Sequence, residues 1–189
     1  MKESGYLSVE ELHAIGFLEV GNNCHISRKC SFYDVKGYIG DAARVDDFCI
    51  IKGDICIGTR VHVCAYSMLS GTRGSIVLYP NAVLAARCSI YTGSNDHSGV
   101  DNLGAGCEGI PEHLTKEFFG DVVVGLGVLI GAHVVILPGV NIGDGATVGA
   151  GCIVSGNIDE GAIVRQRGTS KRKRDVVSIR DRIEEVING

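Results

Sequence analysis

The stretch IGAHVVILPGVNIGDGATVGAGCIV, residues 130–154, repeats one short pattern over its whole length. An aliphatic residue returns at every sixth position, and a small or β-branched residue follows each of them four places later. The first series is Val124, Ile130, Ile136, Ile142, Val148 and Val154, and the second is Val128, Val134, Val140, Ala146, Cys152 and Ile158. A period of six fits neither an amphipathic helix nor a strand with one buried face. It indicates a very short strand followed by a turn, repeated as a unit.

The same pattern runs through the first half of the chain with more interruptions. Its large apolar positions are Val20, Ile26, Phe32, Ile39, Val45, Ile51, Ile57, Val63, Leu69, Leu78, Leu84 and Ile90, and the positions four places later are Cys24, Cys30, Lys36, Ala43, Cys49, Ile55, Val61, Ser67, Arg73, Ala82, Cys88 and Ser94. Units that pair only with the units above and below them form a solenoid. An ordinary β-sandwich would not keep one period on both sides of a long interruption, so we predict an all-β solenoid.

Composition agrees with a single glycine-rich domain. The 189 residues include Gly 27, Pro 3 and Trp 0, and the net charge of −4 gives no general attraction for nucleic acid. No apolar run approaches the roughly 18 to 20 residues of a membrane span, and the N-terminus has no signal-peptide pattern. We therefore expect a cytoplasmic protein without membrane insertion. The chain has Cys 8 but no C-x-x-C pair, and most cysteines occupy packing positions, so we predict neither disulfides nor a metal site.

Both ends of the chain predict helices. Within residues 1–19, Ser8 and Glu11 have the spacing of a capping box, which indicates a short helical cap. Residues 166–189 begin with a basic turn and continue with apolar residues at helical spacing, namely Val176, Ile179, Ile183, Val186 and Ile187. We expect the two helices to cover ends or sides of the solenoid, because an uncapped stack exposes unpaired strand edges.

The repeat of residues 130–154 resembles the hexapeptide-repeat, or isoleucine-patch, acyltransferases. This resemblance covers residues 20–165 and implies a left-handed parallel β-helix with three hexapeptides per coil. In the register of the repeat, the chain has about six coils, with the loop 92–121 inserted between the fourth and the fifth. The opening segment LSVEELHAIGF, residues 7–17, resembles the subgroup that acetylates nucleotide-linked amino sugars such as dTDP-viosamine.

The inserted loop contains GSNDHSGVDNLGAG, residues 93–106, which lacks the repeat. Loops this long inside a compact domain are usually functional or disordered. Acyl transfer from a thioester needs a base for the acceptor's proton, and histidine titrates near neutral pH. The resemblance implies that His97 is this base, and the alternatives are a surface histidine or a substrate contact. Asp96 or Asn95 would orient the imidazole, although an acidic partner from elsewhere would serve equally well.

Three residues outside the loop's centre are candidates for contacts with the acceptor: His62, Tyr66 and Tyr91. His62 follows a small inward residue at a corner, and solvated surface is the alternative interpretation. His133 has the same corner position in the later coils and is a candidate for the cofactor groove. No Ser or Cys lies in a nucleophile elbow, which favours direct transfer without a covalent enzyme intermediate.

The resemblance also implies acetyl-CoA as co-substrate, bound along the later coils between two subunits of a homotrimer. Small residues would let the pantetheine arm lie against the backbone, and cations would bind the anionic end of CoA. The candidates are Gly131, Ala132, Gly149, Ala150, Arg165, Arg167, Lys171 and Arg172. A solvated basic turn is the alternative for the cations. The G-x-P-A-K turn of many relatives is absent, and RQRGTSKRK, residues 165–173, stands in its place.

These features favour an acetyl-CoA-dependent acetyltransferase with direct attack by a sugar hydroxyl or amine. The sugar is expected to be nucleotide-linked and destined for a surface polysaccharide, and His97 is expected to act as general base. Two alternatives are an acetyltransferase for a non-sugar acceptor, such as an amino acid or an antibiotic, and a non-catalytic β-helix scaffold.

Overall fold

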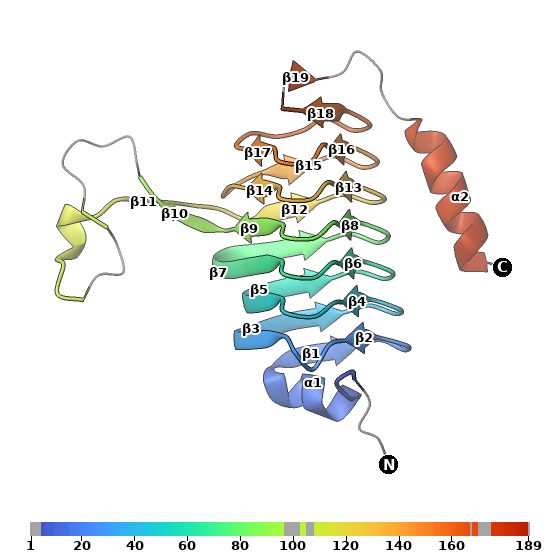
Figure 1. Ribbon diagram of the computed structural model, residues 1–189, viewed down its shortest axis with the longest axis horizontal. Coiled ribbons are helices and arrows are strands. Elements are labelled where there is room, and N and C mark those ends of the chain that lie inside the picture. Colours follow the sequence, from blue (N-terminus) through green and yellow to red (C-terminus); the bar gives the residue numbers. More distant parts are fainter. Residues whose placement is uncertain (1–4, 97–102, 105–107, 167, 170–174, 189) are drawn as a thin grey trace.

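The computed structural model describes residues 5–96, 103–104, 108–166, 168–169 and 175–188. Its body is a β-solenoid of about seven turns, from which an arm projects on one side (Figure 1). One face of the solenoid carries an eight-stranded sheet, in which every strand except the antiparallel β19 belongs to a different turn. Six turns contain three strand segments, as the repeat predicts, and the last turn ends at β18.

Two sheets make up the three faces of the solenoid. The eight-stranded sheet consists of β2 (His25–Ile26), β4 (Arg44–Val45), β6 (His62–Val63), β8 (Val83–Leu84), β13 (Leu129–Ile130), β16 (Thr147–Val148), β18 (Ile163–Arg165) and β19 (Gly168–Thr169). The nine-stranded sheet consists of β1 (Phe17–Val20), β3 (Ser31–Ile39), β5 (Ile50–Ile57), β7 (Met68–Leu78), β9 (Ser89–Tyr91), β12 (Val122–Val124), β14 (Val135–Ile136), β15 (Asn141–Ile142) and β17 (Ile153–Val154).

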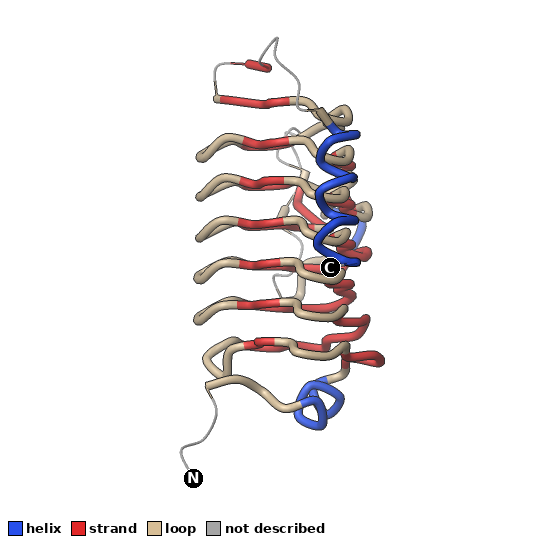
Figure 2. The backbone as a smooth tube through the Cα atoms, turned by 90° about the vertical axis from the view of Figure 1, so that its right-hand side faces the viewer, coloured by secondary structure: helices blue, strands red, loops and turns tan. Residues whose placement is uncertain are grey.

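Each coil turns at three corners. In the fifth coil the first corner comprises residues 125–128, the second corner residues 131–134 and the third corner residues 137–140. Corners of successive coils are joined by backbone hydrogen bonds. The Gly145 N–H donates to the Leu126 carbonyl at the first corner (2.7 Å), and the Gly151 N–H donates to the Ala132 carbonyl at the second (2.8 Å). The rungs therefore lie in register, as Figure 2 shows.

The six-residue repeat forms the core. Every aliphatic position from Val124 to Val154 is at most 5% exposed, and every position four places later is at most 8% exposed. Cysteine takes the inner position of the second corner in several coils, and Cys49 and Cys88 are fully buried there. Burial raises the pKa of the Cys88 thiol to about 11, so this cysteine behaves as a small apolar residue.

The repeat is interrupted at the third corner of the early coils. The pattern predicts inward positions for Lys36 and Arg73, but both side chains are exposed. The reason is that β3, β5 and β7 each run continuously through this corner from one coil to the next, and β7 carries extra residues between Leu69 and Leu78. These long strands open the corner from which the arm later leaves.

Helices cover one end and one corner of the solenoid. Helix α1 (Val9–Ile15) has the predicted capping box between Ser8 and Glu11, and its Leu12 packs into the N-terminal end of the core. Helix α2 (Val176–Asn188) runs along the first corner of the later coils (Figure 2). Its Ile179 packs against Gly127 and Gly145, whose positive φ angles and missing side chains allow this close approach. Neither helix in the described part of the chain is long and apolar enough to span a membrane.

Candidate functional site

The arm leaves the third corner after β9 and returns to it before β12. Its base is an antiparallel pair of β10 (Gly93–Asn95) and β11 (Glu117–Phe119), and a short 3₁₀ turn, Glu112–Leu114, lies further out. Three interactions tie this base to the long strand β7. The Arg73 guanidinium pairs with the Glu117 carboxylate (2.6 Å), the Arg73 N–H donates to Thr92 Oγ1 (3.1 Å), and the Ser75 N–H donates to Asp121 Oδ1 (2.7 Å). The exposed Arg73 therefore helps to position the arm.

Asp96 lies at the end of β10 and is almost wholly buried. Its side chain is 1% exposed, and Lys116 Nζ lies 3.0 Å from its Oδ2. The Asp96 N–H also donates to the Lys116 carbonyl (2.8 Å), so both backbone and side chain of Asp96 are held across the arm. The ammonium of Lys116 compensates the carboxylate charge, which burial alone would disfavour.

A cavity of about 520 Å³ opens beside Asp96, between the arm and the third corner of the later coils. It is lined by Ser94, Asn95, Asp96, Phe118, Phe119, Leu137, Pro138 and Ser155. The arm contributes polar residues at β10 and the aromatic residues of β11, and the third corner contributes Leu137, Pro138 and Ser155. Such a mixed lining suits a ligand with one polar and one apolar part. Asn95 and Asp96 are predicted site residues that line this cavity, whereas His97 lies outside the described residues.

The residues predicted for the cofactor lie together at a different corner. Gly131 and Ala132 stack directly below Gly149 and Ala150 at the second corner, and a side chain at Gly131 would collide with the backbone of Ala150. Arg165 follows in the next turn, and its side chain reaches the same corner, where a cavity of about 270 Å³ lies. Arg167, Lys171 and Arg172 lie outside the described residues. Within one copy, the face formed by β9, β14 and β17 separates this corner from the Asp96 cavity.

The candidates for acceptor contacts are dispersed. His62 belongs to β6, on the face opposite the arm, and its Nε2 lies 2.9 Å from Asp46 Oδ2. Tyr66 lies at the second corner, where its ring stacks on Phe48 with 5.0 Å between centroids. His133, the candidate for the cofactor groove, lies at the second corner of a later coil and is exposed. Only Tyr91, the last residue of β9, lies beside the base of the arm.

Several residues around the arm are not predictable from the sequence. Lys116, Phe118 and Phe119 lie in a segment without any repeat, and nothing in their spacing indicates that β11 pairs with β10.

A second cavity of about 520 Å³ lies at the opened third corner of the early coils, lined by Asp34, Lys36, Gly53, Asp54, Gly71, Thr72, Gly74, Ser75 and Asp121. The sequence contains one signal for this second cavity, the glycines Gly53 and Gly71. They pair in adjacent strands, and their backbones are in close contact.

No protein-family model matches the chain. The chain is 35% identical over 155 residues to the dTDP-4-amino-4,6-dideoxy-D-glucose acyltransferase of Escherichia coli, covering 79% of this chain and 78% of that protein. Among solved structures, AntD, an N-acyltransferase from Bacillus cereus in complex with dTDP and 3-hydroxybutyryl-CoA, has a TM-score of 0.85 and 34% identity over 99% of this chain and 100% of that chain. A variant of AntD in complex with dTDP-4-amino-4,6-dideoxyglucose and coenzyme A has a TM-score of 0.83 and 34% identity, over 97% and 100% of the two chains.

Stacked coils, an inserted arm and these similarities together define an acyltransferase of the left-handed β-helix class. Within this class, the chain belongs to the family of the dTDP-4-amino-4,6-dideoxy-D-glucose acyltransferase of Escherichia coli. The family that the hexapeptide repeat and the opening segment predict is thereby confirmed.

Proposed function

We propose that this enzyme transfers an acyl group from acyl-CoA to the amino group of a nucleotide-linked amino-dideoxy sugar. The observation that carries the proposal is the cavity beside the buried Asp96 carboxylate, at the base of the arm. A related enzyme, AntD, has been solved with dTDP-4-amino-4,6-dideoxyglucose and coenzyme A, which supports an amine as acceptor. Acetyl is the proposed acyl group, and a surface polysaccharide assembled from cytoplasmic precursors is the proposed destination of the product.

The reaction needs a neutral amine. Its lone pair attacks the thioester carbonyl, the C–N bond forms, the C–S bond breaks, and the CoA thiolate leaves and takes up a proton. An amine with a pKa of about 8 is mostly protonated at pH 7, so a base that accepts its proton speeds the reaction. His97, directly after Asp96, is proposed as this base. Asn95, Asp96 or an acidic residue from elsewhere is proposed to orient the imidazole, and a backbone N–H of the arm would stabilise the oxyanion.

The CoA site is proposed at the second corner. The small residues Gly131, Ala132, Gly149 and Ala150 are proposed to contact the pantetheine arm there, while Arg165 and the predicted cations Arg167, Lys171 and Arg172 would bind the phosphates. A homotrimer would place this corner of one copy against the Asp96 cavity of the next. Large exposed apolar side chains support such an assembly, because Phe119 at the cavity and Ile153 on the intervening face are each 71% exposed.

Steady-state kinetics of His97→Ala tests the proposal. The assay follows release of the CoA thiol, with dTDP-4-amino-4,6-dideoxyglucose or its 4-hydroxyl counterpart as acceptor. We expect transfer to the amine by wild type and loss of kcat/KM in the variant at pH 7. Between pH 7 and 9 the variant should regain about tenfold, because the neutral fraction of an amine with a pKa of about 8 rises by that factor. For any hydroxyl acceptor that is used, the loss should be about 10² or more.

The matched control is His113→Ala, which removes an exposed histidine of the same arm. This control should keep wild-type kinetics. Unchanged turnover of His97→Ala at pH 7 would remove His97 from the mechanism, whereas the absence of thiol release by wild type with every nucleotide-linked amino sugar would refute the proposed function itself.

A further inference from the structure

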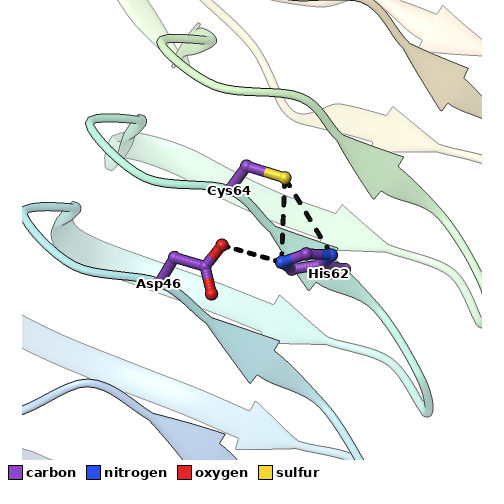
Figure 3. A group of neighbouring side chains, drawn as sticks. All are labelled: Asp46, His62 and Cys64. Carbon is purple, nitrogen blue, oxygen red and sulfur yellow. Dashed lines mark hydrogen bonds and ion pairs between the residues drawn. The ribbon is translucent and has the colours of Figure 1, made fainter.

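Three side chains of types that bind metal ions meet on the outer face of the second and third coils (Figure 3). Asp46 follows β4, His62 begins β6, and Cys64 follows β6. All three point outward because inward and outward residues alternate along each short strand, and Val45 and Val63 are the buried neighbours. This face lies opposite the arm, so the cluster is separate from the cavity beside Asp96.

The three potential ligand atoms lie close enough together to converge on one ion. One ligand atom from each residue lies within 4.8 Å of the other two. His62 Nε2 is 2.9 Å from Asp46 Oδ2 and 3.7 Å from Cys64 Sγ. Ligands bound at about 2.0 to 2.3 Å with tetrahedral angles lie about 3.3 to 3.7 Å apart, so small movements suffice to close the cluster around an ion.

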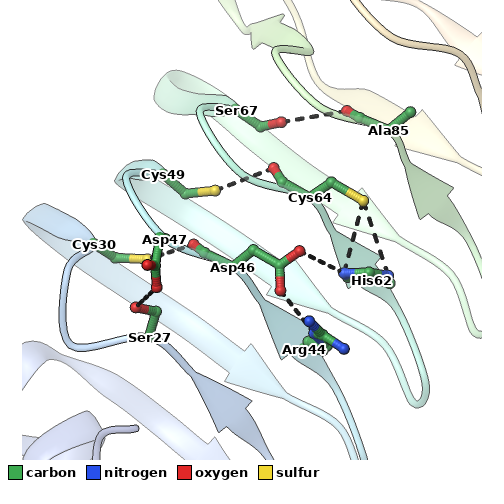
Figure 4. A network of polar contacts seen from close by, with 10 residues as sticks. All are labelled: Ser27, Cys30, Arg44, Asp46, Asp47, Cys49, His62, Cys64, Ser67 and Ala85. Carbon is green, nitrogen blue, oxygen red and sulfur yellow. Dashed lines mark hydrogen bonds and ion pairs between the residues drawn. The ribbon is translucent and has the colours of Figure 1, made fainter. Parts of the chain in front are cut away.

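Neighbouring groups hold the carboxylate in place (Figure 4). Arg44 Nε donates to Asp46 Oδ1 at 2.7 Å, which leaves Oδ2 facing His62. The Cys30 thiol donates to the backbone carbonyl of Asp46 (3.1 Å). Hydrogen bonds of this kind orient metal-binding carboxylates in known sites. The side chains of Asp46 and His62 are 23% and 31% exposed, so an ion can reach them from solvent.

We propose that Asp46, His62 and Cys64 bind a borderline-soft divalent ion of the Zn²⁺ type. Mixed sulfur, nitrogen and oxygen ligands suit Zn²⁺, whereas Mg²⁺ and Ca²⁺ prefer oxygen ligands alone. The ion displaces the thiol proton, and His62 binds it through Nε2 as the neutral tautomer that carries its proton on Nδ1. Water completes the shell at the outward position. Because Asp46 comes from the second coil and the other two ligands from the third, the bound ion joins two rungs. The proposal is independent of acyl transfer.

The spacing of the ligands explains why local motifs give no metal prediction. Arg44 pairs with His62 across adjacent coils, and Asp46 lies directly below Cys64 in the same register. Ligands that meet through stacking are one full coil apart in the chain, so they form no C-x-x-C or H-x-x-x-H pattern. The signal that the sequence does contain is the spacing of Asp46 and Cys64, two metal-binding residue types one coil apart.

Cobalt titration of the full chain tests the site, since Co²⁺ replaces Zn²⁺ and its bond to a thiolate gives a charge-transfer absorption band. After dialysis against a chelator, wild type should bind one Co²⁺ per chain with this band, and Zn²⁺ should remove it by displacement. Cys64→Ser should abolish the band, and Asp46→Asn should weaken Co²⁺ binding at least tenfold. Arg44→Gln should weaken binding about 10- to 100-fold, as expected for a residue that orients a ligand.

The matched control is Cys56→Ser, which removes another half-buried thiol of the same part of the solenoid. This control should bind Co²⁺ as wild type does, and circular dichroism should show that each variant folds. Three results would overturn the proposal: absence of the band in folded wild type, its persistence in Cys64→Ser, or its loss in Cys56→Ser. In the first case, Asp46 and His62 form an ion pair only.

Discussion

Ile50 and Ile51 are adjacent residues of one strand, yet only Ile51 occupies an aliphatic position of the six-residue period. Ile51 is fully buried, and Ile50 is 37% exposed. The period distinguishes such neighbours wherever each face of a coil contains one hexapeptide. It fails at Lys36 and Arg73, because a local pattern does not reveal that a strand continues through a corner. Inward positions in the later coils were therefore predictable, whereas the opened corner of the early coils was not.

Because Ile51 is buried and Ile50 is not, replacing each by alanine should lower the free energy of unfolding by different amounts. Ile51→Ala should lower the free energy of unfolding by about 2–5 kcal/mol, because it leaves a cavity in a core only a few side chains wide. Ile50→Ala should lower it by about 1 kcal/mol or less. Urea unfolding at one fixed protein concentration measures both. Equal costs for the two variants would show that the period does not define the core.

Among the elements, the terminal helices and the arm differ in how far sequence predicts them. The capping box of α1 and the apolar spacing of α2 are local signals, and both helices form. The arm's position follows from the interruption of the repeat, and Asn95 and Asp96 follow from their place next to His97. Its internal pairing with Lys116, Phe118 and Phe119 depends on contacts between residues far apart in sequence, which no period encodes.

Helix α1 should become less stable in acid. Hydrogen bonds from Arg28 and from the Ser8 backbone hold the pKa of Glu11 below its ordinary value. A carboxyl with a lowered folded-state pKa stabilises the fold above its unfolded-state value of about 4.5, and this contribution is lost as the pH falls through the folded-state pKa. Hydrogen exchange of α1 amides, compared with those of β16, should therefore lose protection below about pH 4.5.

Replacing Glu11 by Gln removes the titrating group while keeping the size of the side chain. In this variant, α1 should already exchange faster at pH 7, and the extra loss below pH 4.5 should disappear. An unchanged acid response in Glu11→Gln would show that other carboxyl groups control the stability of α1.

At the scale of the whole molecule, the proposed site needs more than one copy. The Asp96 cavity lies at the third corner and the small residues proposed to contact CoA lie at the second, with a complete face between them. Sequence repeats predict the stack and its insertion, but they contain no information about which corners of neighbouring copies meet. The exposed Phe119 and Ile153 lie on the surfaces that such an assembly would cover.

Mixing two obstructed variants tests most directly whether acyl transfer occurs between the two corners of neighbouring copies. Ser155→Trp would fill the cavity at the third corner, and Ala150→Trp would obstruct the second; both residues are exposed, so the core is unaffected. Each variant alone should form trimers without acyl transfer. Co-expressed and purified as mixed trimers, the two should regain part of the wild-type rate of thiol release, because some sites then combine two unobstructed corners. Inactive mixed trimers, full activity of either single variant, or a monomeric wild type by light scattering would contradict the account.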